Sequence, residues 1–206
     1  MSCNFAVLAS GKGSNLQAII DELEQGNIQG HLSVVVSDNA SAGALQRAEL
    51  HGIDNRCIAP ENYAQKSDYE KDLADFLEEK RIGLVVLAGF MRVLSGELLG
   101  RFPARVMNIH PSLLPAFPGL DAVEQAWEYG VKITGCTVHI VEEEVDAGPI
   151  ILQEAVPVLA EDDVNSLQQR VHAAEHRCYP RAVDMFCKGE ITVKGRRCYL
   201  YDKSVR

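Results

Sequence analysis

Short apolar runs alternate with longer amphipathic stretches through the first half of the chain. The runs at 5–8, 32–36 and 84–88 are rich in aliphatic and β-branched residues over the length of a strand. Between them, residues 16–24, 42–51 and 63–80 have helical periodicity, and positions 16, 19, 20 and 23 share one face. Strands alternating with helices predict an α/β fold with a mostly parallel sheet flanked by helices and a Rossmann-like N-terminal half.

The second half is less regular. Residues 105–110, 135–141 and 150–156 have strand character, and positions 136, 138 and 140 alternate with the polar residues Thr137 and His139. The prolines and glycine within residues 111–119 predict a loop.

A long helical pattern covers residues 164–187, where Pro180 is expected to end or kink the helix. The chain has no internal repeat and no linker. We therefore predict a single domain, 1–206, with a nucleotide-phosphate-binding half at 1–100 and a second half at 101–206.

Composition and charge exclude some classes of function. The 206 residues are 47% hydrophobic and 24% charged, as in ordinary globular enzymes. A formal charge of −9 argues against nonspecific nucleic-acid binding but not against an anionic small substrate. The N-terminus has no basic region of a signal peptide and no membrane-length apolar run, so we expect a cytoplasmic protein without membrane contact. The six cysteines form no Cys-x-x-Cys pair, which predicts reduced thiols and no bound metal.

A glycine-containing loop, Ser10-Gly11-Lys12-Gly13-Ser14-Asn15, follows the first expected strand and opens a helix. Its glycines allow a tight turn and close approach of a ligand, and Ser14 or Asn15 can cap the helix. The first N–H groups of a helix, the helix dipole and the charge of Lys12 favour an anion. The pattern predicts a phosphate-binding loop.

Other interpretations of this loop compete with that one. A dinucleotide fingerprint lacks its third glycine, because Leu16 stands in that place, although Asp38 could imitate the ribose-binding acid. The spacing excludes a Walker A loop. A tight strand–helix turn without a ligand stays open, and among ligands a mononucleotide phosphate fits best.

Two polar residues lie at the end of the expected strand 105–110. Asn108 and His110 project from the same side of an extended chain, so an amide and an imidazole face one cleft. α/β sheets usually place ligands at the carboxyl ends of their strands. A lone histidine is more often structural, and packing of His110 beside Pro111 stays open as the alternative.

Four motifs together resemble those of glycinamide ribonucleotide formyltransferases. They are the loop at 10–15, Leu87-Ala88-Gly89-Phe90-Met91-Arg92, Asn108-Ile109-His110-Pro111-Ser112-Leu113-Leu114-Pro115 and Asp146-Ala147-Gly148-Pro149. The resemblance extends from about residue 5 to about residue 188. The Asn-x-His…Asp set is shared by several folate-dependent formyl-transfer enzymes, whereas the His-Pro-Ser-Leu-Leu-Pro form with the N-terminal glycine loop indicates the purine enzyme.

The resemblance implies a formyltransferase fold and transfer of the formyl group of 10-formyltetrahydrofolate, a co-substrate, to the amine of glycinamide ribonucleotide in purine biosynthesis. Asn108 would stabilise the oxyanion of a tetrahedral intermediate, and His110 would act as general acid or electrostatic partner. Asp146 would set the charge state of the histidine. Because this set contains no cysteine or serine nucleophile, the amine would attack directly.

The resemblance also implies two binding sites and a monomer or homodimer. The ribonucleotide would contact Gly11, Lys12, Gly13, Ser14, Asn15, His172 and Glu175. The reduced folate would contact Lys66, Met91, Arg92, Val93, Leu94, Asn108, Glu142, Glu143, Glu144, Val145 and Asp146. Two departures stand out, because Lys66 replaces an arginine of some members, and Asp121 lies where some bacterial members have histidines.

Four other functions are weighed against this one. A hydrolase that releases formate from the same folate would not use the phosphate loop, and the deformylases carry an extra N-terminal domain, whereas this chain starts at the first strand. A formyltransferase for initiator methionyl-tRNA fits poorly with the acidic charge and the lack of a C-terminal RNA-binding domain. A non-catalytic nucleotide-binding module would not need the Asn–His–Asp set. The pattern His-x-x-Glu-His at 172–176 matches inverted zinc proteases, but no other feature indicates a protease.

Overall fold

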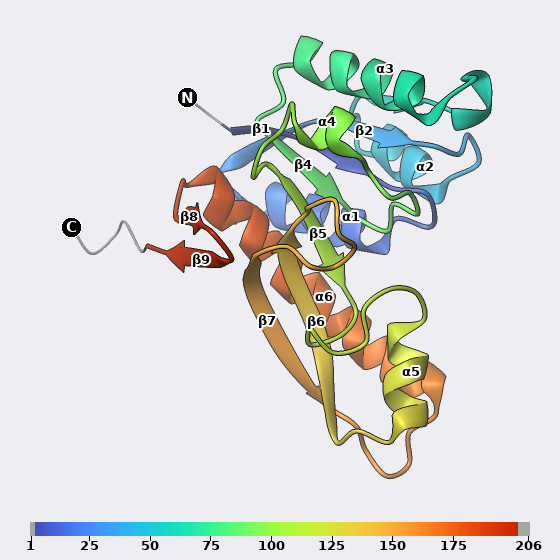
Figure 1. Ribbon diagram of the computed structural model, residues 1–206, viewed down its shortest axis with the longest axis vertical. Helices are drawn as coiled ribbons and strands as arrows, with labels where there is room; N and C mark the ends of the chain where they lie inside the picture. The colour runs from blue at the N-terminus through green and yellow to red at the C-terminus, as the bar shows by residue number, and fades with distance from the viewer. Residues whose placement is uncertain (1–2, 202–206) are drawn as a thin grey trace. The chain divides into compact units, whose positions relative to one another are not determined.

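The computed structural model describes residues 3–201 of the chain (Figure 1). The chain divides into two compact units, of which the first ends at Met107 and the second begins at Asn108. Within residues 3–201, no helix is long and apolar enough to cross a membrane.

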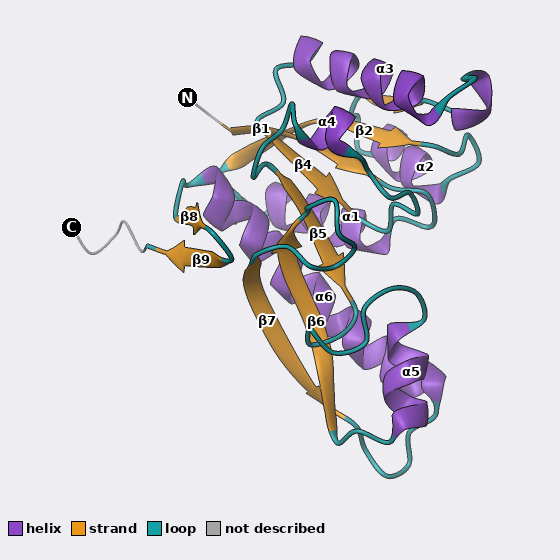
Figure 2. Ribbon diagram, in the orientation of Figure 1, coloured by secondary structure: helices purple, strands orange, loops and turns teal. Residues whose placement is uncertain are grey.

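The first unit is built around a parallel sheet. Its strands are β1 (Cys3–Leu8), β2 (Gly30–Ser37), β3 (Asn55–Cys57) and β4 (Leu84–Leu87), in the order β3-β2-β1-β4 with three parallel pairings. Its helices are α1 (Ser14–Glu24), α2 (Gly43–Leu50), α3 (Lys66–Glu79) and α4 (Gly96–Leu99), with a 3₁₀ turn η1 (Pro60–Asn62) before α3. Because helices separate the strands along the chain, the carboxyl ends of neighbouring strands lie at one edge of the sheet (Figure 2).

Burial on both faces explains the apolar sequences of β1 and β4. Residues 5–8 are fully buried, and residues 84–87 are at most 5% exposed. Strands covered by helices on both faces need apolar side chains without alternation. Helix α1 buries Leu16, Ile19 and Ile20, three of the four positions predicted to share a face.

The second unit has a mixed sheet. Strand β5 (Val106–His110) crosses the division between the units, and β6 (Ile133–Ile140), β7 (Ile150–Pro157), β8 (Ile191–Lys194) and β9 (Arg197–Leu200) follow it. The pairs β6–β7 and β8–β9 are antiparallel, whereas β7 and β9 pair in parallel. Helix α6 (Val164–Cys187) packs against β6 and β7, and α5 (Ala122–Tyr129) packs against α6 (Figure 1).

The predicted α/β fold with a mostly parallel sheet flanked by helices is confirmed. Every strand and helix expected from periodicity is present, with ends that differ by three residues or fewer. Residues 111–119 form the predicted loop. Three short strands, β3, β8 and β9, and two short helices, α4 and α5, were not anticipated.

Helix α6 and strand β6 show details that their sequence patterns did not reveal. Pro180 does not end α6, which continues to Cys187, because Pro180, Cys178 and Tyr179 are buried in the packed face of the helix. Burial of this face outweighs the roughly 3 kcal/mol cost of an internal proline. The alternation along β6 marks no solvent-facing side, since Thr137 and His139 are both buried.

Candidate active site

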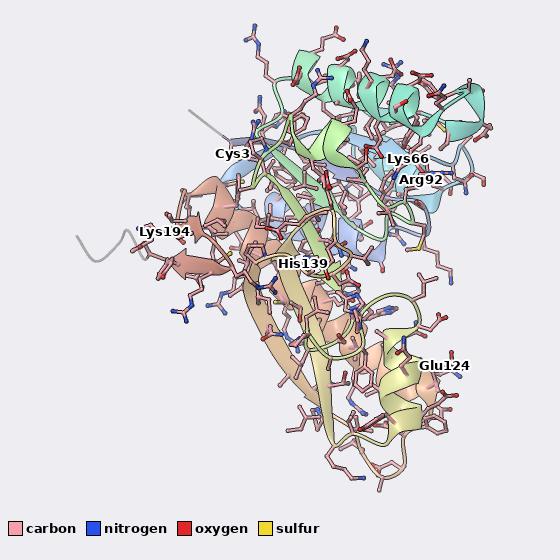
Figure 3. All side chains as sticks on the ribbon, viewed as in Figure 1. Cys3, Lys66, Arg92, Glu124, His139 and Lys194 are labelled. Atoms are coloured by element: carbon pink, nitrogen blue, oxygen red, sulfur yellow. The ribbon has the colours of Figure 1, made fainter. Side chains whose placement is uncertain are left out.

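Four polar side chains of the second unit converge on one point. Asn108 and His110 come from β5, His139 from the end of β6 and Asp146 from the loop between β6 and β7 (Figure 3 labels His139). His110 and His139 are 4% and 2% exposed. The structure thus brings together the three residues predicted to be catalytic and adds His139 to them.

His110 has an acceptor at each ring nitrogen. Its Nε2 lies 2.8 Å from the carbonyl oxygen of Phe117, which can only accept, so Nε2 carries a hydrogen. Its Nδ1 lies 3.3 Å from Oδ2 of Asp146. A protonated ring therefore donates on both sides, and its positive charge sits beside a carboxylate.

His139 was not predicted as a site residue. Its Nδ1 lies 2.9 Å from the carbonyl oxygen of Ile140 and therefore carries a hydrogen. Its Nε2 lies 3.2 Å from Nδ2 of Asn108 and accepts from that amide whenever Nε2 carries no hydrogen. An amide nitrogen has two hydrogens, so His139 fixes the orientation of Asn108 and leaves its second N–H for a ligand.

The carboxylate of Asp146 is held by three partners. Besides His110, it accepts from the backbone N–H of Gly119 at 2.8 Å, and its Oδ1 lies 3.6 Å from Nε2 of His139. Burial raises the pKa of Asp146, but the contact with His139, the Gly119 N–H and the charges of the two histidines outweigh it, and the pKa lies below its usual value. Asp146 is therefore ionised at neutral pH.

Loop 111–119 follows His110 and is held in place by hydrogen bonds to Thr137 of β6 and Gln153 of β7. The hydroxyl of Thr137 donates to the carbonyl of Ser112 at 2.7 Å and accepts from the N–H of Leu114 at 3.0 Å. Gln153 donates to Thr137 and to the carbonyl of Leu114. These contacts explain why Thr137 can be buried in β6.

The glycine loop of the first unit differs in detail from the expectation. Gly13, with φ +73°, is the N-cap of α1 and has no side-chain cap, so the prediction that Ser14 or Asn15 caps the helix is wrong. A Cβ at Gly13 would lie 2.9 Å from Cα of Ala44. Only glycine combines this conformation with so close a neighbour.

Helix α2 sets the path of the same loop. The N–H of Ala44 donates to the carbonyl of Gly11 at 3.1 Å, and Nε of Arg47 donates to the carbonyl of Lys12 at 2.9 Å. Gly11, Lys12 and α2 line a cavity of about 590 Å³.

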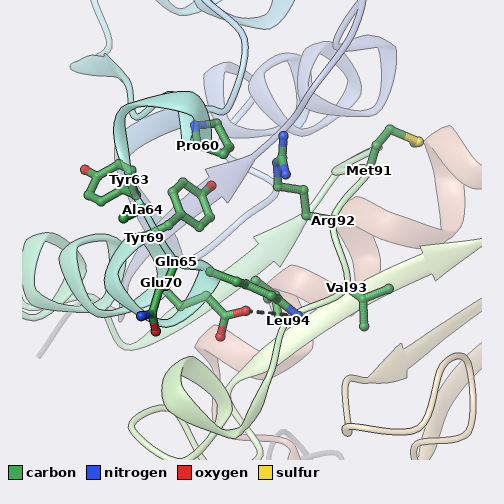
Figure 4. A pocket seen from close by; sticks show the side chains of 11 residues that line it. Pro60, Tyr63, Ala64, Gln65, Tyr69, Glu70, Met91, Arg92, Val93 and Leu94 are labelled. Carbon is green, nitrogen blue, oxygen red and sulfur yellow. Dashed lines mark ion pairs between the residues drawn. The ribbon is translucent and has the colours of Figure 1, made fainter.

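Five predicted folate-binding residues gather in one pocket of the first unit. Lys66 at the start of α3 and residues 91–94 line a cavity of about 430 Å³, together with Tyr63, Tyr69 and Glu70 (Figure 4). Nε of Arg92 donates to Asp38 at 2.8 Å, and its guanidinium lies 5.9 Å from the ring centre of Tyr69. Met91 and Val93 are 69% and 56% exposed, so this rim offers apolar side chains to a ligand.

The remaining predicted residues lie in the second unit. Glu142, Glu143, Glu144 and Val145 are exposed in the β6–β7 loop that also carries Asp146. On α6, Glu175 is buried, and burial lowers the pKa of the half-buried His172. The rings of His172 and His176 stack with centres 6.4 Å apart. Among the residues that the structure describes, no group of three or more His, Cys, Asp or Glu side chains is arranged to hold a metal ion.

Comparisons with known proteins agree with these features. The family model for formyl transferase matches residues 3–183. The crystal structure of glycinamide ribonucleotide transformylase 1 from Symbiobacterium toebii is 49% identical, covers 98% of this chain and 95% of its own, and superposes with a TM-score of 0.95. The chain belongs to the glycinamide ribonucleotide formyltransferase family. The family assignment made from the four motifs is confirmed.

Two further relatives are a longer, trifunctional protein and a deformylase. The trifunctional purine biosynthetic protein adenosine-3 of Homo sapiens is 45% identical over 96% of this chain, which spans 20% of that protein's length. A formyltetrahydrofolate deformylase from Pseudomonas syringae is 25% identical with a TM-score of 0.90, covering 98% of this chain and 67% of the deformylase. Because transferases and a deformylase share the fold, the reaction must be argued from the site.

Replacing Asp146 by Asn should lower stability at neutral pH and have a smaller effect in acid. The pKa of folded Asp146 lies below the unfolded value of 3.8, so its charge stabilises the fold fully above that value. The contribution is lost as the pH falls through the folded pKa. Urea denaturation at about pH 7 and about pH 3.5 measures both free energies of unfolding.

Asp121→Asn is the matched control, because Asp121 is exposed and has almost the same φ, 55° against 54°. It should unfold like the wild type at both pH values. A loss from Asp146→Asn that stayed equally large in acid would contradict the electrostatic explanation.

Proposed function

We propose that this protein transfers the formyl group of 10-formyltetrahydrofolate to the amine of glycinamide ribonucleotide in purine biosynthesis. The observation that carries the proposal is the convergence of Asn108, His110 and Asp146 in a chain of this family. We further propose that it works in the cytoplasm as a monomer or homodimer, with small-molecule substrates and without nucleic acid.

The reaction joins the amine nitrogen to the formyl carbon and breaks the bond from that carbon to N10 of the folate. The carbonyl oxygen becomes negative in the tetrahedral intermediate, and the free N–H of Asn108 is the directional donor for it. Both nitrogens of His110 face acceptors, so the ring can offer the oxyanion positive charge when both nitrogens carry a hydrogen. Asp146 keeps that charge in place, and the proton lost by the amine goes to N10 through a group or water of the site.

Binding is assigned to residues of both units. We propose that Gly11, Lys12, Gly13, Ser14 and Asn15 hold the ribonucleotide phosphate at the start of α1, with His172 and Glu175 contacting the rest of that substrate. We propose that the folate contacts Lys66, Met91, Arg92, Val93 and Leu94, and also Glu142, Glu143, Glu144 and Val145. We also assign Asn108 and Asp146 to folate binding.

Folate turnover should require the ribonucleotide amine. Purified protein is mixed with 10-formyltetrahydrofolate, and the absorbance of tetrahydrofolate is followed with and without glycinamide ribonucleotide. We expect product only when both are present, because the ribonucleotide amine is the proposed nucleophile. Equally fast turnover without the ribonucleotide would mean that the protein is a deformylase, the second candidate that the shared fold supports.

Gly13→Ala should raise the ribonucleotide KM about tenfold or more while the folate KM changes little. The added Cβ meets Ala44 in a left-handed conformation, so the first N–H groups of α1 must shift. Gly26→Ala, just beyond the other end of α1, is the control, since Gly26 also has a positive φ (+77°) but a Cβ there meets nothing within 4 Å. Equal losses for both substrates, or equal effects of both variants, would show that this loop does not bind the phosphate.

Loss of Asn108 or His110 should lower kcat on the order of 10²-fold and change KM far less, because their contributions arise in the transition state. His139→Phe removes the acceptor that orients Asn108 and should also lower kcat. A double variant with Asn108→Ala should then be no slower than Asn108→Ala alone, since His139 acts through that amide.

Steady-state kinetics and thermal melting of each variant separate chemistry from packing. If His110 only packs beside Pro111, His110→Asn will melt earlier and keep a normal kcat, which would contradict its catalytic assignment.

A further inference from the structure

Glu70 on α3 is a fully buried carboxylate outside the Asn–His–Asp cluster. It forms one wall of the pocket that contains Lys66 and residues 91–94 (Figure 4). Burial of a carboxylate is costly unless several donors surround it. The partners of Glu70 are therefore the key to its role.

Most of those donors belong to Ser95. Its backbone N–H lies 3.1 and 3.0 Å from the two carboxylate oxygens, and its hydroxyl donates to Oε2 at 2.6 Å. Ser95 is also the N-cap of α4, where its hydroxyl accepts from the N–H of Glu97. Glu70 thus fixes the point where segment 91–94 ends and α4 begins.

The same segment is fixed at its other end and in its middle. The N–H of Met91 donates to the hydroxyl of Ser10 at 2.9 Å, and Arg92 pairs with the nearly buried Asp38. The contact between Glu70 and Ser95 holds its downstream end against α3, where α4 also packs. Without it, Met91 and Val93, the exposed apolar side chains of the rim, lose their fixed position.

Glu70 also orients the cation of the pocket. Nζ of Lys66 lies 3.4 Å from Oε1, one helical turn away, and the lysine side chain is 57% exposed. The Lys66 ammonium has three N–H donors and its contact with Oε1 uses at most one, so it is held over the pocket without being fully engaged. It keeps donors available for an anionic group of the ligand.

We infer that Glu70 is a positioning residue of the folate pocket, which fixes segment 91–94 through Ser95 and holds Lys66 above the pocket. The inference rests on the proposed function, since it takes the folate to occupy this cavity. It distinguishes two tasks: Lys66 recognises the negative glutamate end of the folate, and Glu70 shapes the site for the whole molecule.

Calorimetry of the full chain tests this with tetrahydrofolate and with tetrahydropteroate, which lacks the glutamate. Glu70→Gln should weaken binding of both on the order of tenfold, and Lys66→Met should weaken binding of tetrahydrofolate alone. The ribonucleotide Kd of Glu70→Gln should change far less than its folate Kd.

Glu79→Gln, an exposed carboxyl at the end of the same helix, is the matched control and should bind both compounds normally. Ser95→Ala removes the hydroxyl alone and should weaken both in the same direction, which keeps the test available if Glu70→Gln does not fold. A folded Glu70→Gln with normal folate affinity, or with equal loss for folate and ribonucleotide, overturns the inference.

The two proposals fail separately. A wild type that binds tetrahydrofolate in a Glu70-dependent way but transfers no formyl group would refute the function and support the inference. A wild type that transfers formyl groups while Glu70→Gln binds folate normally would refute the inference alone.

Discussion

A carboxylate removed from water needs partners, and in the second unit that need organises the structure around Asp146. Its side chain is 9% exposed and its φ is +54°, so both solvation and backbone conformation oppose its position. Two histidines and the N–H of Gly119 compensate, and each comes from a different segment. The ends of β5 and β6 and the path of loop 111–119 must therefore all be correct for one carboxylate to stay charged.

Glu70 and Asp38 show the same constraint in the first unit. Each carboxylate is almost completely buried and binds a donor from the segment that follows β4, Ser95 in one case and Arg92 in the other. Buried carboxylates thus bind loop residues and hold the loops against a rigid sheet. Ligand-binding side chains keep fixed positions, although the loops themselves are not buried. Part of the chain's acidic excess is thus internal and structural, and says little about the charge of its ligands.

The strand–helix order of this fold could be predicted because each buried strand is a run of apolar residues, and each helix that packs on the sheet has one apolar face. The missed elements are too short to show a clear period: β3 has three residues, β8, β9 and α4 have four each, and α5 has eight. Asn108 and His110 could be paired because two residues on one strand obey a period of two. His139 could not be predicted, because its partner Asn108 lies 31 residues away, and the local sequence does not show which strands pair. The cap of α1 was misjudged for a related reason: the crowding by Ala44 that requires Gly13 comes from another helix.

The amide of Asn108 and the imidazole of His110 differ in whether an N–H group is left to bind a ligand. Asn108 has two N–H groups, and His139 uses one, so exactly oriented donation to a new oxyanion costs no existing bond. His110 could donate to a ligand only by giving up the carbonyl of Phe117 at 2.8 Å. That residue has a positive φ of 51°, and its ring packs against Tyr129, so the carbonyl is held where it is. The amide is therefore the better placed group for the directional bond, and the ionised Asp146 and the carbonyl of Phe117 fix the imidazole beside it.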